Sequence, residues 1–89
     1  MNENEKIQFI SCINHLSLDA HFGTLIADGE ELTTIERNDE FISFIDLHGD
    51  ILEFEIEMVT NFTYTVKPNY SKMIINLSNG VTHVIKYTR

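Results

Sequence analysis

The sequence predicts a small, mostly β domain, built as one antiparallel sheet or a partly open barrel of about six or seven strands. Turn-forming residues recur at short intervals, and the segments between them are rich in Ile, Val, Thr, Phe and Tyr, which favour strands. Strands this closely spaced leave no room for the helical crossovers of a parallel sheet. Because 89 residues supply only one small core, we expect a single domain over residues 1–89. The turn signals are Asp28-Gly29, Arg37-Asn38-Asp39, His48-Gly49-Asp50, Lys67-Pro68-Asn69 and Asn79-Gly80.

The N-terminal residues 3–18 fit two structures. Ile7, Ile10 and Ile13, with Leu16 or Ser17, form a stripe at helical spacing. Glu3 and Glu5 would suit a helix N-terminus, where the helix dipole favours negative charge. Residues 7, 9, 11 and 13 also alternate as a strand would. The sequence leaves a short N-terminal helix and a strand both open.

Three strands are predicted next, over residues 23–27, 31–36 and 40–47. In the last of these, Ile42 and Phe44 share one face, and the other face carries Phe41, Ser43, Ile45 and Leu47.

Residues 51–66 alternate apolar and polar side chains over two strand lengths. In the first strand the glutamates Glu53, Glu55 and Glu57 face one way, which predicts a half-buried strand with an acidic outer stripe. The opposite face carries Leu52, Phe54, Ile56 and Met58. The second strand alternates Phe62, Tyr64 and Val66 with polar residues.

Residues 72–87 predict the closing hairpin. Asn79-Gly80 suits a two-residue type I′ turn, in which both central residues have positive φ. Such a turn sets the register, and both faces of the hairpin would then be partly apolar. The expected pairs are Ser78 with Val81, Asn76 with His83, Ile74 with Ile85, and Lys72 with Tyr87.

Charge is unevenly distributed along the chain, whose formal net charge is −8. Residues 1–57 hold all 14 acidic residues against Lys6 and Arg37, whereas residues 58–89 hold no acid and four basic residues. A chain this acidic is repelled by nucleic acid and by anionic lipid, so we expect neither as a direct partner.

Residues that would mark catalysis or metal binding are sparse. A single cysteine, Cys12, excludes an internal disulfide and a multi-cysteine zinc site. His15, Asp19 and His21 lack a familiar zinc spacing, and turn formation accounts for Asp46 and Asp50 better than calcium binding does. We therefore predict no enzyme, no metal site and no cofactor.

The layout from about Gly23 onward resembles the bacterial GRAM and pleckstrin-homology-like family. "GTLIADGEELTTIE" is similar to the opening hairpin of that family, "LEFEIEMVTNF" to its central segment and "KMIINLSNGVTHVIKY" to its closing hairpin. Glu57 replaces the proline usual in the central segment, so the strand is expected to continue unbroken there. The chain ends at Arg89, without the helix that plugs such barrels, so the N-terminal segment or a partner chain is expected to cover the sheet. The resemblance implies a binding or scaffolding role, with proteins or lipid headgroups as partners and no catalysis.

The sequence thus predicts a small cytoplasmic, non-catalytic interaction module that binds another protein with a basic surface. Cytoplasmic location is expected because the N-terminus lacks the pattern of a secretory signal. The candidate binding residues are Asp46, Asp50, Glu53, Glu55 and Glu57. Two alternatives stay open: a phage-type inhibitor that imitates nucleic acid to block a defence or DNA-processing enzyme, and a structural subunit that self-associates, as a homodimer or larger homo-oligomer, through uncovered sheet edges.

Overall fold

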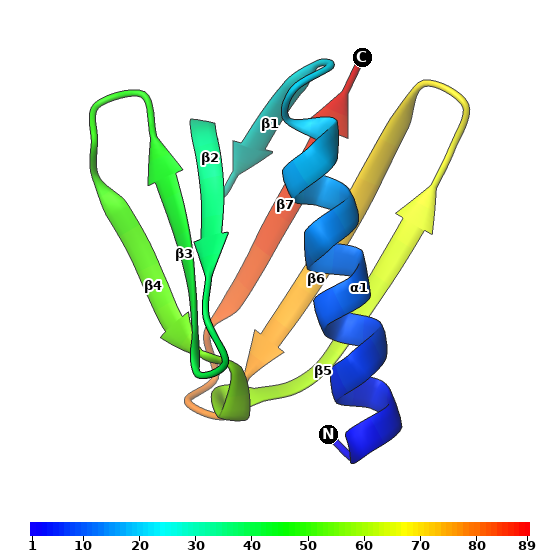
Figure 1. Cartoon of the computed structure of the whole chain (residues 1–89), viewed down its shortest axis with the longest axis vertical. Helices are drawn as coiled ribbons and strands as arrows, with labels where there is room; N and C mark the ends of the chain where they lie inside the picture. Colours follow the sequence, from blue (N-terminus) through cyan, green and yellow to red (C-terminus); the bar gives the residue numbers. More distant parts are fainter.

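The computed structural model describes residues 1–89 and contains one N-terminal helix and a single antiparallel sheet of seven strands that does not close into a barrel (Figure 1). The predicted fold class is confirmed. The strand order is β4-β3-β2-β1-β7-β6-β5, so β4 and β5 form the two edges. In chain order the elements are α1 (Glu3–Asp19), β1 (Thr24–Ala27), β2 (Glu30–Arg37), β3 (Phe41–Asp46), β4 (Ile51–Glu55), the 3₁₀ turn η1 (Ile56–Met58), β5 (Val59–Val66), β6 (Tyr70–Leu77) and β7 (Thr82–Thr88).

The N-terminal segment is a helix of 17 residues, which decides between the two structures that the sequence left open. It begins with a capping box, in which Asn2 Oδ1 accepts from the Glu5 backbone N–H at 2.8 Å and the Glu5 carboxylate accepts from the Asn2 N–H at 3.2 Å. Phe9, Ile13 and Leu16 are its buried residues. Ile7, expected in the apolar stripe, is exposed, so the buried face is rotated from the predicted one.

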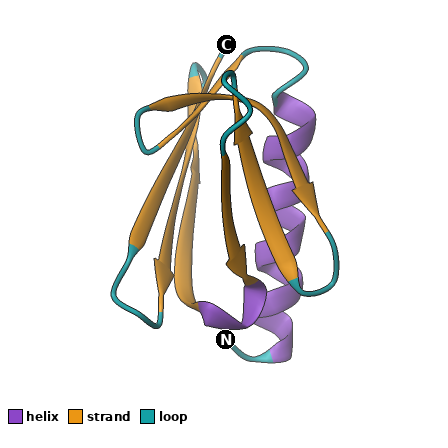
Figure 2. Cartoon of the chain, turned by 90° about the vertical axis from the view of Figure 1, so that its left-hand side faces the viewer, coloured by secondary structure: helices purple, strands orange, loops and turns teal.

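The sheet bends sharply along β2. Its first residues pair with β1, and after an irregularity between Leu32 and Thr34 the rest of the strand pairs only with β3. The helix contacts β2 beyond the bend, where Ser17 Oγ donates to the Ile35 carbonyl at 3.4 Å. Figure 2 shows the result, a strongly curved sheet with α1 along one side. The N-terminal segment therefore covers part of the sheet, which is one of the two arrangements expected from the sequence.

The core lies between the helix and the inner face of the curved sheet, and contains 17 buried apolar residues. Phe9 on α1 meets Phe62 on β5 edge-to-face, with ring centroids 5.2 Å apart. Phe44 and Phe54 pair across β3 and β4 at 5.8 Å, which extends the core into the part of the sheet beyond the bend.

The closing hairpin has a different turn from the predicted one. Leu77 N–H donates to the Val81 carbonyl, and Gly80 N–H donates back to the Leu77 carbonyl. Gly80 has a φ of +87°, whereas Asn79 is not in the left-handed region. This is a three-residue loop with glycine at the bulge position, rather than a type I′ turn.

The longer loop shifts the register by one residue, so the predicted pairing was wrong. His83 pairs with Ile75, and Ile85 with Met73. A one-residue shift moves every side chain of a strand to the opposite face. The buried residues of both strands gather on one face: Ser71, Met73, Ile75, Leu77, His83, Ile85 and Tyr87. The other face carries the half-buried Ile74 and Val84, so both faces are partly apolar, as predicted, although each face holds different residues of β7 from those expected.

The strand expected to run unbroken through Glu57 ends at Glu55 instead, so that expectation was wrong. The 3₁₀ turn η1 follows, with the Ile56 N–H donating to the Glu40 carbonyl at 2.8 Å. Because β4 and β5 are consecutive in the chain but form opposite edges of the sheet, the chain has to cross between them at this point. Figure 1 shows this crossing at one end of the sheet.

Candidate functional site

The strand order separates the charges in space. We define the acidic wing as residues 28–57, which comprise β2, β3, β4, their turns and η1. It holds one basic residue, Arg37, whereas β5 to β7 and their adjoining residues hold four basic residues and no acid (Figure 1). The acidic wing carries the carboxylates of Asp28, Glu30, Glu31, Glu36, Asp39, Glu40, Asp46, Asp50, Glu53, Glu55 and Glu57.

These carboxylates are almost free of partners of opposite charge. The only pair of acidic and basic side chains within 4.0 Å is Asp28 with His83, at 2.6 Å. Arg37, the one basic residue of the wing, donates its Nε–H to Asn14 Oδ1 on the helix at 2.9 Å. No lysine or arginine of the chain lies within 4.0 Å of these carboxylates, and the wing therefore presents negative potential.

The predicted acidic stripe is divided by the structure. Glu53 and Glu55 are exposed on β4, opposite the buried Phe54, as alternation predicted. Glu53 Oε1 accepts from Ser43 Oγ at 3.1 Å on the neighbouring strand. Glu57 lies in η1 rather than on the strand. Glu55 and Glu57 instead line a hollow of about 240 Å³ together with Asp39 and Glu40.

Asp46 and Asp50 lie elsewhere, at the turn between β3 and β4. Asp46 Oδ1 accepts from the backbone N–H groups of His48 and Asp50, at 2.8 and 3.0 Å. This arrangement, in which an aspartate closes its own turn, confirms the turn-forming role expected for Asp46. The five predicted residues thus do not form one continuous patch.

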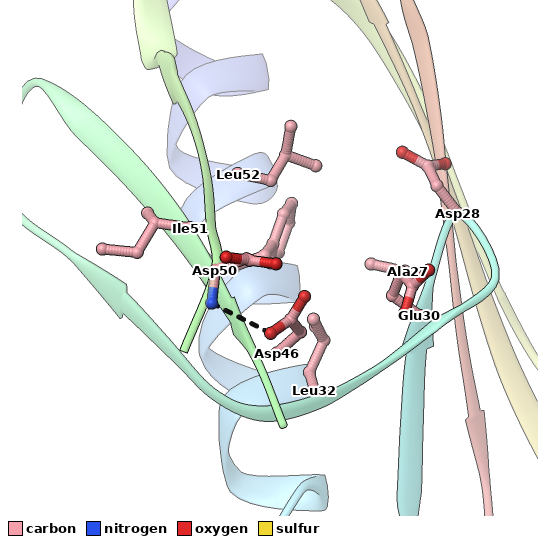
Figure 3. Close-up of a pocket in the computed structure, with 9 residues that line it drawn as sticks. Ala27, Asp28, Glu30, Leu32, Asp46, Asp50, Ile51 and Leu52 are labelled. Carbon is pink, nitrogen blue, oxygen red and sulfur yellow. Dashed lines mark hydrogen bonds between the residues drawn. The ribbon is translucent and has the colours of Figure 1, made fainter. Parts of the chain in front are cut away.

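Asp46 and Asp50 belong to a cleft that the sequence did not reveal, which we call the carboxylate-rimmed cleft (Figure 3). It has a volume of about 230 Å³ and lies between the β1–β2 turn and the β3–β4 hairpin. Apolar residues supply five of its nine lining side chains: Ala27, Leu32, Phe44, Ile51 and Leu52. Figure 3 shows the four carboxylates around the cleft, with Asp46 and Asp50 on one side and Asp28 and Glu30 across from them.

Asp28 is held in place by β7. Its Oδ1 accepts from the Val84 backbone N–H at 2.8 Å, and its Oδ2 lies 2.6 Å from His83 Nδ1. The His83 ring is buried and stacks on Phe54, with centroids 5.5 Å apart. One wall of the carboxylate-rimmed cleft is therefore rigidly positioned, because strand, turn and core histidine are hydrogen-bonded together.

A third hollow lies between the C-terminal half of α1 and the ends of β5, β6 and β7, with a volume of about 310 Å³. Burial raises the pKa of the Tyr64 hydroxyl there, against a hydrogen bond with Ser71 that lowers it. Cys12, half-buried in the helix, has a thiol whose pKa burial also raises, which disfavours the reactive thiolate. The residues of this hollow are His15, Asp19, Tyr64, Val66, Ser71, Tyr87 and Arg89.

No group of three or more His, Cys, Asp or Glu side chains has the arrangement of a metal site. In particular, the structure does not gather His15, Asp19 and His21 into such a group. Neither α1 nor η1 has the length and apolar character of a helix that crosses a membrane.

Asp28 and Glu30 are site residues that the sequence did not predict, because Asp28-Gly29 indicated only a turn. The signal lay in the register of the last hairpin. With His83 on the buried face, its ring nitrogens need a partner, and the correct pairing of β1 with β7 brings the β1–β2 turn beside it.

Scans against protein-family models, curated proteins and solved structures found no match to this chain.

Proposed function

We propose that this protein is a non-catalytic interaction module whose acidic wing binds a basic surface on another cytoplasmic protein. The observation that carries the proposal is the set of eleven carboxylates of the acidic wing, in the half of the sheet formed by β2, β3 and β4. Only one of them, Asp28, has a basic side chain within 4.0 Å, that of His83. Carboxylates that fold without internal ion pairs keep their full attraction for an external cation.

Binding of this kind is governed by electrostatic steering. A surface of one sign attracts an oppositely charged partner over about a Debye length, roughly 8 Å at physiological ionic strength. Such complementarity raises the association rate and excludes wrong partners more than it raises affinity. Capture by the acidic wing should therefore weaken steeply as salt is added.

The resemblance to GRAM and pleckstrin-homology-like domains supports the same kind of role, since those domains bind partners and do not catalyse reactions. Within that class, the net charge of −8 favours a basic protein over an anionic lipid headgroup.

A second candidate is an inhibitor that imitates nucleic acid. Free carboxylates on an exposed surface can occupy positions that phosphates take in a DNA-binding cleft. The partner would then be a nucleic-acid-binding enzyme, and double-stranded DNA would compete with this protein for it. Competition by DNA therefore distinguishes an inhibitor of a nucleic-acid-binding enzyme from a module that binds a basic protein of another kind.

Self-association is the third candidate, favoured by the opposite charges of the two halves of the sheet and by the edges β4 and β5. A monomer that persists at high concentration and low salt in sedimentation experiments would remove it.

The test is a pull-down from lysate of the source cells with matched charge variants. Glu53→Gln with Glu55→Gln removes two charges from the acidic wing, and Glu3→Gln with Asp19→Asn removes two from outside it. We expect a protein captured by wild type, released by moderate salt, lost with the first variant and retained with the second. If both variants capture the same proteins as wild type at every salt concentration, the outer side of β4 is only a solvated surface.

A further inference from the structure

We propose that the carboxylate-rimmed cleft is the anchor point of this interaction and receives the side chain of an arginine that projects from the partner's basic surface. The inference rests on the proposed function and names the part of the acidic wing where binding energy is concentrated. It is carried by three properties of the cleft: its size, its apolar lining and the positions of its carboxylates.

The size of the cleft favours a single side chain. At about 230 Å³, it is smaller than the roughly 300–1,000 Å³ of pockets that hold drug-sized ligands or cofactors. One long side chain entering end-on fits such a volume. Interfaces commonly concentrate their energy in a few residues of this kind, inserted into pockets, and arginine is enriched among them.

The lining suits the aliphatic part of such a side chain. Of the apolar lining residues, Leu32 and Phe44 are buried and Leu52 is partly exposed, so apolar surface extends from the core to solvent within the cleft. Long basic side chains gain stability when their methylene stems lie on apolar surface while the charged group stays near water. A short cation such as a metal ion gains nothing from this lining.

The charges at the opening suit the guanidinium group. Asp28 and Asp46 each already accept hydrogen bonds from the chain, which fixes both walls. The carboxylates of Glu30 and Asp50, by contrast, form no hydrogen bond or ion pair with any other side chain and lie on opposite sides of the cleft (Figure 3). A planar guanidinium with five donors can engage two carboxylates at once, whereas an ammonium is a more strongly hydrated point charge. This difference favours arginine over lysine.

The direct test is a titration of the ¹⁵N-labelled protein with n-butylguanidinium, followed by amide chemical shifts. Guanidinium chloride supplies the charged group without the stem, n-butanol the stem without the charge, and n-butylammonium the lysine equivalent. We expect n-butylguanidinium to shift amides of residues 27–32 and 44–52 at lower concentration than each of the other three. Equal potency of guanidinium and n-butylguanidinium, or shifts spread over the whole acidic wing, would overturn the inference.

Two matched variants locate the effect. Glu30→Gln with Asp50→Asn is expected to raise the dissociation constant of n-butylguanidinium roughly three- to tenfold, because each partly exposed ion pair contributes a factor of up to about five. Glu53→Gln with Glu55→Gln removes the same charge from the outer side of β4 and should change the constant less than about twofold, since screening weakens distant charges. All four side chains are exposed, so both variants should keep the wild-type pattern of amide shifts elsewhere. Equal weakening by both variants would show non-specific attraction and refute the cleft as the site.

The pull-down separates failure of this inference from failure of the proposed function. If the partner is lost with the Glu53 and Glu55 variant but is captured undiminished by the Glu30 and Asp50 variant, the acidic wing binds without the cleft and the inference is wrong. If neither variant affects capture, the proposed function itself fails.

Discussion

Replacing Asp28 by alanine should destabilise this protein far more than is usual for an exposed residue in a turn. Its carboxylate connects the β1–β2 turn to β7, accepting from the Val84 backbone N–H at 2.8 Å and meeting His83 Nδ1 at 2.6 Å. Asp28 also has a φ of +50°, in the left-handed region that aspartate tolerates better than alanine does.

The expected loss can be estimated from these contacts. Each hydrogen bond to a charged group contributes about 1.5–3 kcal/mol, and the lower value applies because the Asp28 side chain is 37% exposed. The left-handed conformation adds about 1 kcal/mol for alanine. The two bonds and the backbone strain together predict a loss of roughly 3–4 kcal/mol in the free energy of unfolding. For a domain of this size, that corresponds to a fall in Tm on the order of 15–25 °C.

The assay is urea unfolding monitored by circular dichroism, together with thermal unfolding. Asp28→Asn serves as the conservative variant, because asparagine can accept from Val84 and adopts left-handed φ readily, so it should lose only about 1 kcal/mol. Asp39→Ala serves as the control, since Asp39 is an exposed turn residue whose side chain forms no ion pair.

The reasoning would be refuted if Asp28→Ala and Asp39→Ala lowered the free energy of unfolding equally, by less than about 1 kcal/mol, the range of ordinary surface substitutions. It would also fail if Asp28→Asn cost as much as Asp28→Ala. In that case the hydrogen bond from Val84 and the left-handed backbone of residue 28 would contribute nothing to the free energy of unfolding, and only the charge of Asp28 would matter.

Three further outcomes are expected. Gly23→Ala should destabilise strongly, by at least about 2 kcal/mol in urea unfolding, because an added Cβ would lie 2.4 Å from the Thr88 carbonyl oxygen; a loss below that would show that the strand end yields easily. Phe9→Ala should cost roughly 3–5 kcal/mol, since the ring is fully buried at the interface of helix and sheet, and a smaller loss would mean that the helix is not essential to the core. Burial raises the pKa of Cys12 above its ordinary 9.0 and that of Tyr64 above 10.0, so the folded state keeps protons that the unfolded chain releases. The stabilisation from these two groups is complete below about pH 9 and is lost as pH rises beyond it; urea unfolding from pH 8 to 11 should show that decline, and Cys12→Ala with Tyr64→Phe should flatten it.

The sequence determined the class of fold because its signals are local. Alternation at Ile42 and Phe44, and the turn residues between strands, act within a few positions of the chain. The same holds for the charge segregation, since the acidic residues of the wing are contiguous in the chain and neighbouring strands pair with one another. These features could be predicted from the residues alone.

Tertiary structure decided the conformation of the segments whose local sequence is compatible with two structures. Residues 3–18 fit a helix or a strand, and the helix forms where Phe9, Ile13 and Leu16 can cover the open sheet. Asn79-Gly80 permits both a two-residue and a three-residue loop, and the observed register is the one that places His83, Ile85 and Tyr87 in the core.

The candidate site shows the same division. That Glu53 and Glu55 would be exposed followed from the alternation of one strand. The carboxylate-rimmed cleft did not follow from any local pattern, because Asp28 and Glu30 come to line one cleft with Asp46 and Asp50 only through the bend in β2. Local sequence sets which face a side chain takes, but the distance between separate hairpins depends on how the whole sheet curves around its core.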